Sequence, residues 1–446
     1  IRGLVYREGG RILRTGSRPA LELSRLPFPY EDLAAFDRRL LYYESSRGCP
    51  FSCSYCLSSV DKKLRFRDLE LVYRELGLFL DRGVRQVKFI DRTFNCKKSH
   101  AMPIWNYLAS HDNGITNFHF EISADLLDDE MTAVLSRMRP GLVQLEIGIQ
   151  STCPQTIEAI HRRTDLEQAG RMIRQVHAFR NIHQHLDLIA GLPMEDYERF
   201  GQSFDDVYRL HPDQLQLGFL KVLKGTVMKE EAEQYGLLYH RRPPYEVLAT
   251  RWLPYEKLLR LKRVEQLVET YYNSGQFTMT LQALEHRYDS PFHMYEEMGD
   301  FFDEKGFFAV SPSREERYQR LEAFLSVRFP SFQEADRQLL TWDCYLRENA
   351  KKRPAFALDQ QFWSKAVSDF FAEENRQNRY FPHYAGLSYR QLLRQVHMEV
   401  FTFDIPTLAA EGILQKQTLY VCFDYGKRGK LDYNSQTRIL PANLFS

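Results

Sequence analysis

Six strand-like runs recur along residues 41–222, and each gap between them is long enough to hold a helix. The runs occupy Leu41–Ser45, Gln86–Asp91, Asn117–Ser123, Leu142–Gln150, His183–Ile189 and Gln214–Lys221. Strands that alternate with helical segments are typical of βα units, in which the strands pair in parallel. This alternation limits the fold more than any other feature, and it predicts a parallel sheet covered by helices.

The gaps between the runs carry helix signals of their own. Apolar residues recur at helical spacing from Leu69 to Leu80, and Gly83 follows as a stop signal. Asp128 can cap a further helix that runs to about Met138. These signals favour alternating strands and helices over a series of β-hairpins.

Polar and apolar residues alternate within four of the runs. The polar members are His119, Glu121 and Ser123, then Gln144, Glu146, Gly148 and Gln150, then His183, His185 and Asp187, then Gln214 and Gln216. Successive side chains face opposite sides of a sheet, and helices must cover an apolar face, so the polar face is the inner one. An ordinary closed barrel fills its interior with branched apolar side chains. The pattern therefore predicts an incomplete (β/α)6 barrel with a wet lumen for a polar ligand. An antiparallel sheet with one solvated side would give the same alternation.

The length of 446 residues allows two or three domains, and we expect three parts. Residues 1–39 are predicted to form a hairpin over 1–14, with its turn at Gly9-Gly10, and then a linker. Residues 40–225 hold the partial barrel. Residues 226–446 are predicted to be mostly helical, with a helix over Pro254–Asn273 and a late strand at Thr418–Tyr425 before a Gly-Lys-Arg-Gly turn. Its place in the chain suggests a cap over the barrel mouth.

Composition and charge narrow the possible partners. The net charge is +1, which gives no sign of nucleic-acid binding, and no apolar run is long enough to span a bilayer. The chain begins with Ile1 rather than Met, as expected of a fragment or a processed product. The seven cysteines are few and odd in number, which favours a reducing compartment such as the cytoplasm and a metal site over a disulfide framework.

Three of these cysteines, Cys49, Cys53 and Cys56, fall on the loop that follows the first strand. A closed zinc site takes four ligands, whereas three thiolates on a 4Fe–4S cluster leave one iron open. The loop would lie at the carboxyl ends of the strands, where the active sites of βα barrels form. We therefore favour an iron–sulfur site, with zinc or unrelated thiols as the alternatives.

The spacing Cys49-x-x-x-Cys53-x-Tyr55-Cys56 resembles the signature of the radical S-adenosylmethionine (radical SAM) superfamily. That resemblance implies that SAM chelates the free iron and that the reduced cluster cleaves SAM to a 5′-deoxyadenosyl radical. It places Tyr55 beside the adenine. Cofactors of this kind supply the difficult chemistry, while the protein binds and orients them.

Later segments of the barrel resemble the superfamily's SAM-binding stretches. The resemblance implies cofactor contacts from Asp91 on the second strand, Glu121 and Ser123 on the third, Gln150 on the fourth, Arg162 after it, and Asp187 and Gly191 on the fifth. Arg163 is an alternative to its neighbour Arg162. The resemblance implies no particular catalytic side chain.

The opening hairpin, the Leu-Pro-Phe-Pro-Tyr linker at 26–30 and the Asp-Leu-Ile-Ala-Gly-Leu-Pro segment at 187–193 resemble radical SAM proteins with a cobalamin-binding domain. The resemblance implies that residues 1–39 form the exit of such a domain and that residues from 226 form an uncharacterised C-terminal domain. Many such proteins are methyltransferases. We expect cobalamin-dependent methyl transfer to a small-molecule or peptide substrate that the resemblance does not identify, with an electron donor such as flavodoxin or ferredoxin.

Two other functions remain open at this stage. The first is a radical SAM enzyme that catalyses a rearrangement or ring formation without methyl transfer. The second is a non-enzymatic interaction module stabilised by a metal at the three cysteines.

Overall fold

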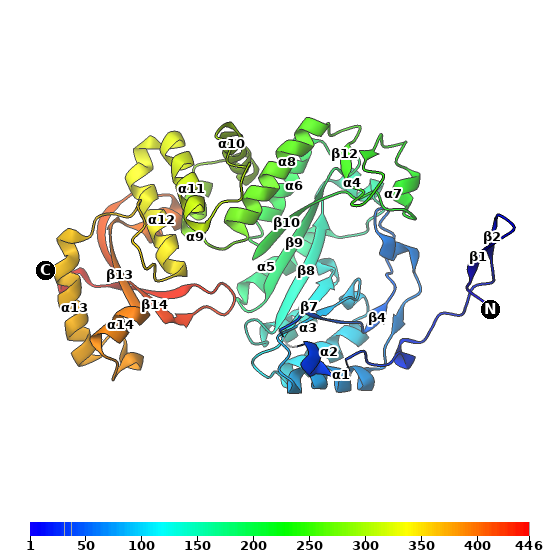
Figure 1. Ribbon diagram of the computed structural model, residues 1–446, viewed down its shortest axis with the longest axis horizontal. Helices are drawn as coiled ribbons and strands as arrows, with labels where there is room; N and C mark the ends of the chain where they lie inside the picture. Colours follow the sequence, from blue (N-terminus) through cyan, green and yellow to red (C-terminus); the bar gives the residue numbers. More distant parts are fainter. Residues whose placement is uncertain (31, 37, 446) are drawn as a thin grey trace.

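The computed structural model describes residues 1–30, 32–36 and 38–445. Glu31 and Asp37, which fall in the predicted linker, and Ser446 lie outside the described residues. The barrel and the C-terminal portion lie side by side, and the N-terminal hairpin projects from the barrel (Figure 1).

A six-stranded sheet forms the centre of the barrel. Its strands are β3 (Leu41–Tyr43), β6 (Gln86–Phe89), β7 (Asn117–Ile122), β8 (Val143–Gln150), β9 (His183–Ala190) and β10 (Gln214–Phe219). They pair in that order and every pairing is parallel. No pairing joins β3 to β10 in the part of the chain that the structure describes. The predicted incomplete (β/α)6 barrel is confirmed.

Helices alternate with these strands along the chain. They are α1 (Leu69–Asp81), α2 (Lys98–Ser110), α3 (Asp129–Ser136), α4 (Pro154–Ala159), α5 (Leu166–Ala178) and α6 (Tyr197–Tyr208). The predicted cap at Asp128 is confirmed, since its side chain accepts a hydrogen bond from the Met131 backbone N–H. The apolar members of the alternating strands lie fully buried in the core: Phe118, Phe120, Leu145, Leu186 and Leu188.

One polar side chain protects each edge strand of the open sheet. The Tyr30 hydroxyl accepts a hydrogen bond from Tyr42 N on β3 at 2.9 Å and donates one to Tyr42 O at 2.7 Å. At the other edge, the Asn273 amide accepts from Leu215 N and donates to Leu215 O on β10, both at 2.9 Å. Unpaired edge groups otherwise recruit foreign strands. The open barrel thus blocks both of its edges locally.

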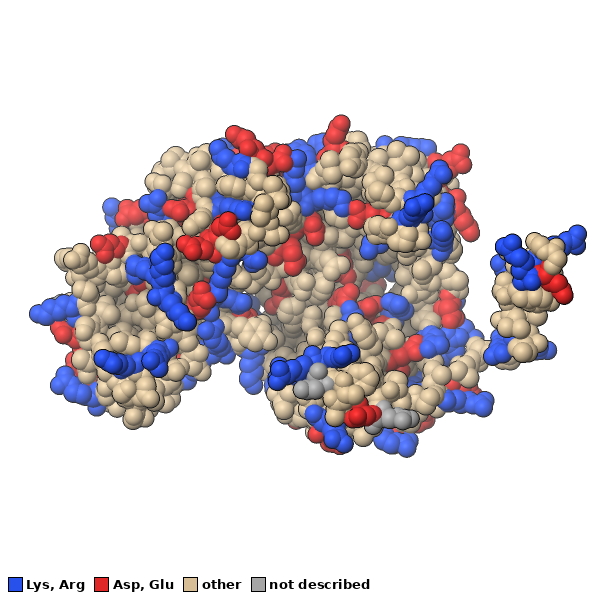
Figure 2. Space-filling model, viewed as in Figure 1, with Lys and Arg blue, Asp and Glu red and all other residues tan. Residues whose placement is uncertain are grey.

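The N-terminal hairpin is confirmed as β1 (Val5–Glu8) paired antiparallel with β2 (Arg11–Arg14). All residues from 1 to 14 are exposed. On the face shown in Figure 2, the hairpin stands clear of the body, and basic and acidic side chains are intermixed over the rest. The pairing of β1 with β2, rather than packing against the body, therefore holds the hairpin together.

The C-terminal portion is less purely helical than expected. It contains α8 (Tyr255–Leu267), a π-helix (Val268–Tyr272), α9 (Thr278–Glu285), α10 (Pro291–Glu304), α11 (Arg314–Arg328), α12 (Gln333–Arg347), α13 (Ser364–Gln377), α14 (Tyr389–Gln395) and α15 (Ile405–Glu411). A three-stranded antiparallel sheet accompanies them, made of β13 (Val396–Phe403), β14 (Lys416–Arg428) and β15 (Ser435–Leu440). The predicted late strand lies inside β14. The Gly-Lys-Arg-Gly segment mostly extends that strand, because the turn comes at Gly429–Asn434.

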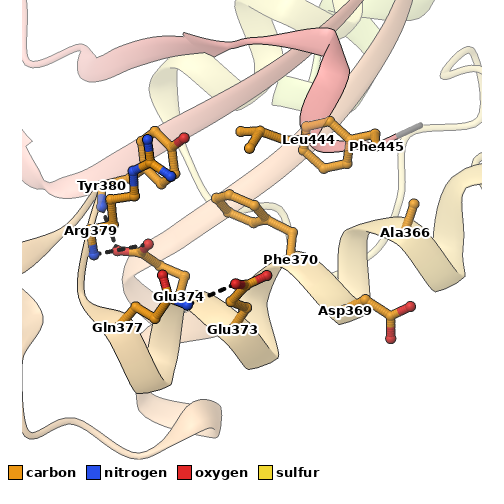
Figure 3. Close-up of a pocket in the computed structure, with 10 residues that line it drawn as sticks. All are labelled: Ala366, Asp369, Phe370, Glu373, Glu374, Gln377, Arg379, Tyr380, Leu444 and Phe445. Carbon is orange, nitrogen blue, oxygen red and sulfur yellow. Dashed lines mark hydrogen bonds between the residues drawn. The ribbon is translucent and has the colours of Figure 1, made fainter.

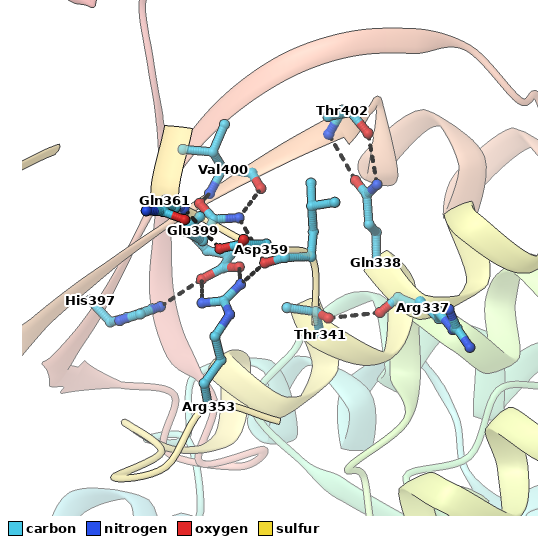
Figure 4. A network of polar contacts seen from close by, with 12 residues as sticks. Arg337, Gln338, Thr341, Arg353, Asp359, Gln361, His397, Glu399, Val400 and Thr402 are labelled. Atoms are coloured by element: carbon cyan, nitrogen blue, oxygen red, sulfur yellow. Dashed lines mark hydrogen bonds and ion pairs between the residues drawn. The ribbon is translucent and has the colours of Figure 1, made fainter. Parts of the chain in front are cut away.

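Buried polar groups tie this sheet to the helices around it (Figure 4). Glu399 on β13 is fully buried and pairs with the Arg353 guanidinium and with His397 Nε2 at 3.1 Å. Gln338 on α12 donates to the Thr402 hydroxyl at 2.7 Å and accepts from the Thr402 backbone N–H at 2.8 Å. The Glu399 carboxylate and the Gln338 amide both find partners, which is the condition for burying them at acceptable cost.

From the π-helix onward, the C-terminal portion contacts the barrel away from the strands' carboxyl ends, whereas Val247 N donates to Leu220 O, just after β10, at 2.8 Å. Phe292 at the start of α10 packs on α6, and its backbone N–H donates to Asp205 at 2.7 Å. The Tyr272 hydroxyl donates to Pro212 O just before β10, and a side chain added at Gly141, before β8, would meet Leu431. These contacts lie beside β10 and at the amino ends of the strands. The contacts of α10 and of the β14–β15 turn lie away from the mouth, and the predicted cap over it stays a prediction.

Candidate functional site

A cavity of about 190 Å³ lies at the carboxyl ends of the barrel strands. Of the residues singled out from the sequence, it is lined by Cys49, Cys53, Cys56, Tyr55, Glu121, Ser123, Gln150, Arg162 and Asp187. Residues from five separate segments thus meet in one place: the cysteine loop, the end of β7, β8, the turn after α4, and β9. The cysteine spacing, the polar strand alternation and the resemblance to radical SAM proteins together identified these residues.

The cysteine loop is fastened at several points. Its base is closed by β4 (Ser46–Arg47) and β5 (Arg65–Phe66), which pair antiparallel. Within the loop, Cys49 N donates to Asp61 O at 3.1 Å and Ser54 N donates to Ile160 O at 2.9 Å. Ser54 O accepts from Met228 N on α7 (Val227–Glu230) at 2.8 Å. The short segment after β10, rather than the distant helices, is the C-terminal part that touches this loop.

Arg162 is the cation closest to the thiols. Its Nη1 lies 3.8 Å from Cys53 Sγ, and its Nη2 donates to the Gly148 carbonyl on β8. Burial raises the pKa of the Cys53 thiol, and the positive charge of Arg162 opposes that rise. Arg163 also lines the cavity, but it is exposed and makes no contact with a cysteine sulfur that the structure records. Arg162, rather than Arg163, therefore lies beside the cysteines, a choice that the sequence did not make.

The barrel lumen below the cavity is polar, as the strand alternation predicted. Glu146 on β8 is held by Lys88 Nζ at 2.8 Å and His119 Nε2 at 2.9 Å, and the hydrogen bond from His119 is the main reason that its pKa falls to about 2. On β9, His185 Nε2 lies 3.1 Å from Asp187 Oδ1. Burial raises the pKa of Asp187, and this contact with His185 opposes the rise. These pairs supply a charged floor for a polar ligand.

Glu121 differs from the other lumen carboxylates. Its closest cation is Arg92, at 4.0 Å, and its side chain is 26% exposed. Burial and the neighbouring Glu146 raise its pKa to about 7. Glu121 is therefore the cavity carboxylate that changes protonation near neutral pH.

Backbone geometry shapes the wall beside Gln150. Gln150 adopts φ +74°, and the pairing of β8 with β9 shifts register between Gly148 and Gln150. A Cβ added at Gly148 would lie 2.1 Å from Gln150 Nε2, so a larger residue there would force the end of the Gln150 side chain to move. On the neighbouring strand end, Asn95 donates to Ser123 O at 2.8 Å and accepts from Ser123 N at 3.0 Å. Both residues reach the cavity through local backbone arrangements that sequence patterns do not reveal.

Asp91 and Gly191 do not line the cavity. Asp91 is fully buried, and its carboxylate accepts hydrogen bonds from the Ser45 backbone, the Ser45 hydroxyl and the Ser46 hydroxyl. Gly191 has φ +83°, and a Cβ there would lie 2.7 Å from Val247 Cγ1. Close packing therefore explains this glycine. The Asp91 carboxylate faces Ser45 and Ser46 rather than the cavity, and its contact with SAM stays a prediction.

Other cavity residues were not assigned to the site from sequence: Phe51, Ser58, Arg92, Thr93, Ile122, Glu146, Gly148 and Arg163. Glu146 and Gly148 belong to the alternating polar face, so that signal was available. Arg92 and Thr93 come shortly after β6, which ends at Phe89, and their position after a parallel strand is a sequence signal that could have found them.

A second cavity, of about 220 Å³, lies on the C-terminal portion between α13 and the chain end (Figure 3). The carboxylate of Glu374 on its wall accepts the backbone N–H groups of Arg379, Tyr380 and Phe381. That carboxylate therefore closes the end of α13. The cavity wall contains no cysteine or histidine, so the cysteine cavity remains the candidate functional site.

Residues 43–207 match the model of the radical SAM superfamily. This stretch is similar to radical SAM domains. Residues 233–423 match a second family, which is described as a protein of unknown function, DUF4080. The radical SAM match begins at the end of β3 and ends in α6, so it includes the cysteine loop and most of the cavity wall.

Relatives of this radical SAM domain include named methyltransferases. The chain is 26% identical over 248 residues to an uncharacterised methyltransferase of Pyrococcus horikoshii, covering 53% of each protein. It is 28% identical over 228 residues to the cobalamin-dependent radical SAM methyltransferase TokK of Streptomyces tokunonensis, covering 46% of this chain and 33% of that one. The chain thus spans about half the length, or less, of the curated relatives it matches.

A solved structure of the radical SAM methyltransferase TsrM from Kitasatospora setae, with tryptophan substrate and a SAM analog bound, also resembles the chain. The TM-score is 0.46 at 18% identity, covering 54% of this chain and 52% of that one. The fold assignment rests on the strand order described above rather than on this likeness.

The residues at the cavity fit the two cofactors that a radical SAM domain implies, a 4Fe–4S cluster and SAM. Among the described residues, no three His, Cys, Asp or Glu side chains converge closely enough to hold a single metal ion. A cluster of four irons offers a separate iron to each thiolate and needs no such convergence. Three loop thiols beside a polar cavity fit the cluster better than they fit a closed zinc site.

Proposed function

We propose that the chain is the catalytic part of a radical SAM enzyme that cleaves SAM reductively to a 5′-deoxyadenosyl radical. The observation that carries this proposal is that the three signature cysteines line the same cavity as Tyr55, Glu121 and Arg162. The cluster and SAM, when bound, would supply the radical chemistry. The protein would supply thiolate ligands, a binding cavity and control over water access.

Named residues have distinct tasks in this proposal. Cys49, Cys53 and Cys56 hold the cluster, and Arg162 keeps a positive charge beside Cys53, which favours its thiolate form. Glu121 and Asp187 offer carboxylates to the cationic and hydroxyl-bearing parts of SAM from β7 and β9. Tyr55, Ser123 and Gln150 line the wall, where an aromatic face and polar atoms can position an adenosyl group.

We further propose cobalamin-dependent methyl transfer to a small-molecule or peptide substrate. The names of two relatives, both methyltransferases and one of them cobalamin-dependent, support this finer assignment. An electron donor such as flavodoxin or ferredoxin would reduce the cluster. All seven cysteines are free, which agrees with a reducing compartment such as the cytoplasm. In the part of the chain that the structure describes, no helix has the length and apolarity to cross a bilayer.

Cysteine substitutions test the cluster assignment directly. We expect Cys49→Ala, Cys53→Ala or Cys56→Ala to abolish the broad visible absorbance of the anaerobically reconstituted protein and its SAM cleavage. Cys422→Ala is the matched control, because Cys422 is fully buried on β14, far from the loop in the fold. Retained SAM cleavage in Cys53→Ala would contradict the assignment.

Product analysis tests the finer assignment. The reconstituted protein would be incubated with SAM, a reductant, methylcobalamin and candidate substrates. Methylated product together with S-adenosylhomocysteine is the expected result. Formation of 5′-deoxyadenosine with a rearranged or cyclised product instead would favour the alternative without methyl transfer.

A further inference from the structure

A buried polar cluster joins the end of β6 to the root of the cysteine loop. It consists of Asp91, Ser45, Ser46 and His100, all of them less than 5% exposed, and we call it the Asp91 cluster. Asp91 Oδ1 accepts from Ser45 N at 2.8 Å, and Oδ2 accepts from the hydroxyls of Ser45 at 2.7 Å and Ser46 at 2.6 Å. His100 Nε2, on α2, lies 3.0 Å from Ser45 Oγ. None of the four residues lines the cavity.

The hydrogen-bond directions in the Asp91 cluster are fully determined. Asp91 is an acceptor when ionised, so each serine donates its single hydroxyl proton to it. His100 Nε2 must then donate to Ser45 Oγ, which fixes the Nε2–H tautomer. Burial lowers the pKa of His100 to about 4, so the ring is neutral at pH 7 and can take this role. Every member of the cluster has a defined partner.

The cluster sits where the cysteine loop begins. Ser46 opens β4, and only two residues separate it from Cys49. Between them, Gly48 has φ +95°, and a Cβ there would lie 2.6 Å from Lys63 O, so the loop's two arms are in close contact. A displacement of Ser46 would therefore move Cys49 as well, because the two residues between them are held against the loop's other arm and cannot absorb the shift.

Asp91 also adjoins the wall of the cavity that faces the cysteine loop. Asp91 is followed directly by Arg92 and Thr93, which line the cavity, and Thr93 Oγ1 lies 3.7 Å from Cys49 Sγ. The loop and the β6 wall are thus tied through one carboxylate. Burying a carboxylate is costly unless hydrogen bonds offset the cost, and here all of these bonds come from the two residues at the loop's root.

We propose that Asp91 is a positioning residue that holds Cys49 at a fixed distance from the β6 wall of the cavity. It acts through Ser45 and Ser46 rather than by touching SAM. This inference rests on the proposed function, but the position of the cysteine loop can be measured without an activity assay.

The chain offers a matched control in Asp343. This residue is also fully buried, and it accepts from two backbone N–H groups, of Met279 and Thr280, and from the Thr280 hydroxyl at 2.7 Å. It lies on α12, away from the cysteine loop, beside the buried Cys344. The two aspartates therefore have similar burial and similar partners, and each has a neighbouring buried thiol as a reporter.

The test measures thiol alkylation in the full-length, reduced, cluster-free protein by mass spectrometry. We expect Asp91→Ala to raise the alkylation rate of Cys49 by about tenfold or more, because hydrogen bonds to a charged group no longer oppose local opening. The rate at Cys344 should stay unchanged. Asp343→Ala should show the reverse pattern. Asp91→Asn keeps the shape and the Ser45 N contact, so it should restore most of the protection at Cys49.

A second measurement follows cluster loading. Asp91→Ala should bind less than about half the iron of the wild type after reconstitution, while Asp343→Ala should bind as much. If Asp91→Ala leaves both Cys49 alkylation and iron content at the wild-type level, the inference is overturned. If Asp91→Ala does not fold, Ser46→Ala and Thr280→Val replace the aspartate variants, and unchanged Cys49 alkylation in Ser46→Ala would then overturn it. A wild-type protein that binds no iron would refute the proposed function but leave the alkylation result interpretable.

Discussion

Single carboxylates in the barrel take different protonation states because their neighbours differ. Glu146 touches Lys88 and His119, and these partners, led by the hydrogen bond from His119, lower its pKa to about 2. Glu121 lies one strand away, its nearest cation is Arg92 at 4.0 Å, and burial raises its pKa to about 7. One residue type thus supplies both a permanent charge and a charge that depends on pH.

The pKa of Glu121 predicts a pH-dependent affinity for SAM. Because the pKa is raised to about 7, the carboxylate gains its charge as the pH rises from 6 to 8. SAM carries a sulfonium cation, so its dissociation constant should fall over this range by about fivefold, or about 1 kcal/mol. Equilibrium dialysis of the cluster-loaded protein at pH 6, 7 and 8 measures this.

Two variants separate Glu121 from general effects of pH. Glu121→Gln should bind SAM with a nearly constant affinity across the same range. Glu411→Gln, at an exposed position on α15, should keep the wild-type slope. The assignment fails if the Glu121→Gln protein keeps the full pH dependence.

At the residue scale, the sequence predicted best where spacing determines chemistry. The cysteines line one cavity as their spacing suggested, and so do Tyr55 and Arg162, which the family resemblance implied. Asp91 is hard to place from sequence, because a strand-end carboxylate looks the same whether it faces a cavity or neighbouring serines. Its hydrogen bonds with Ser45 and Ser46 show which partners it has in the structure.

At the element scale, protection of the sheet edges allows the barrel to remain open. Asn273 occupies both backbone groups of Leu215 on β10, and Tyr30 does the same for Tyr42 on β3. Neither residue belongs to the sheet. Each comes from a segment that a strand pattern would not associate with the barrel.

The Asn273 contact predicts a measurable loss of stability. Asn273→Ala should lower the free energy of unfolding by about 1–3 kcal/mol, because two backbone groups of a partly buried strand lose their partner. Asn349→Ala is the control, since Asn349 only donates to two carbonyls at 3.4 Å, and it should cost less than about 0.5 kcal/mol. Urea denaturation measures both values. Equal losses in the two variants would contradict the edge role.

Sequence periodicity predicted the six parallel strands closely, because each is a short apolar or alternating run between helices. It predicted only one of the three C-terminal strands. The strand β13 follows α14 without a break in the backbone path, and its buried run Val396–Phe403 includes the charged Glu399. A buried charge masks a strand pattern, and Arg353, which neutralises it, lies 46 residues away in the sequence.

At the scale of the whole molecule, the chain joins a barrel that carries the site to a second portion that contacts it along α6 and β10. The division into 1–39, 40–225 and 226–446 stays a prediction. Contacts at Ser54 and Met228 show that the segment just after β10 also belongs to the cavity's surroundings. Sequence alone could not show this, since the segment has no periodic pattern.

The exposed hairpin predicts that the body is stable without it. Deleting residues 1–16 should change the free energy of unfolding by less than about 0.5 kcal/mol, because an isolated two-stranded hairpin adds little stability. Deleting residues 1–30 should cost at least about 2 kcal/mol, since Phe28 and Tyr30 pack on Phe79 of α1. Thermal and urea unfolding compare the two truncations, and a large loss in the shorter one would contradict this view of the hairpin.

The central claim is that three cysteines hold a cluster that cleaves SAM in this cavity. The most direct measurement is the metal content of the anaerobically reconstituted chain, followed by quantitation of 5′-deoxyadenosine after reduction with SAM present. The account predicts about four irons per chain and formation of 5′-deoxyadenosine. A chain that binds about one zinc, binds no iron and leaves SAM intact under reduction would contradict it.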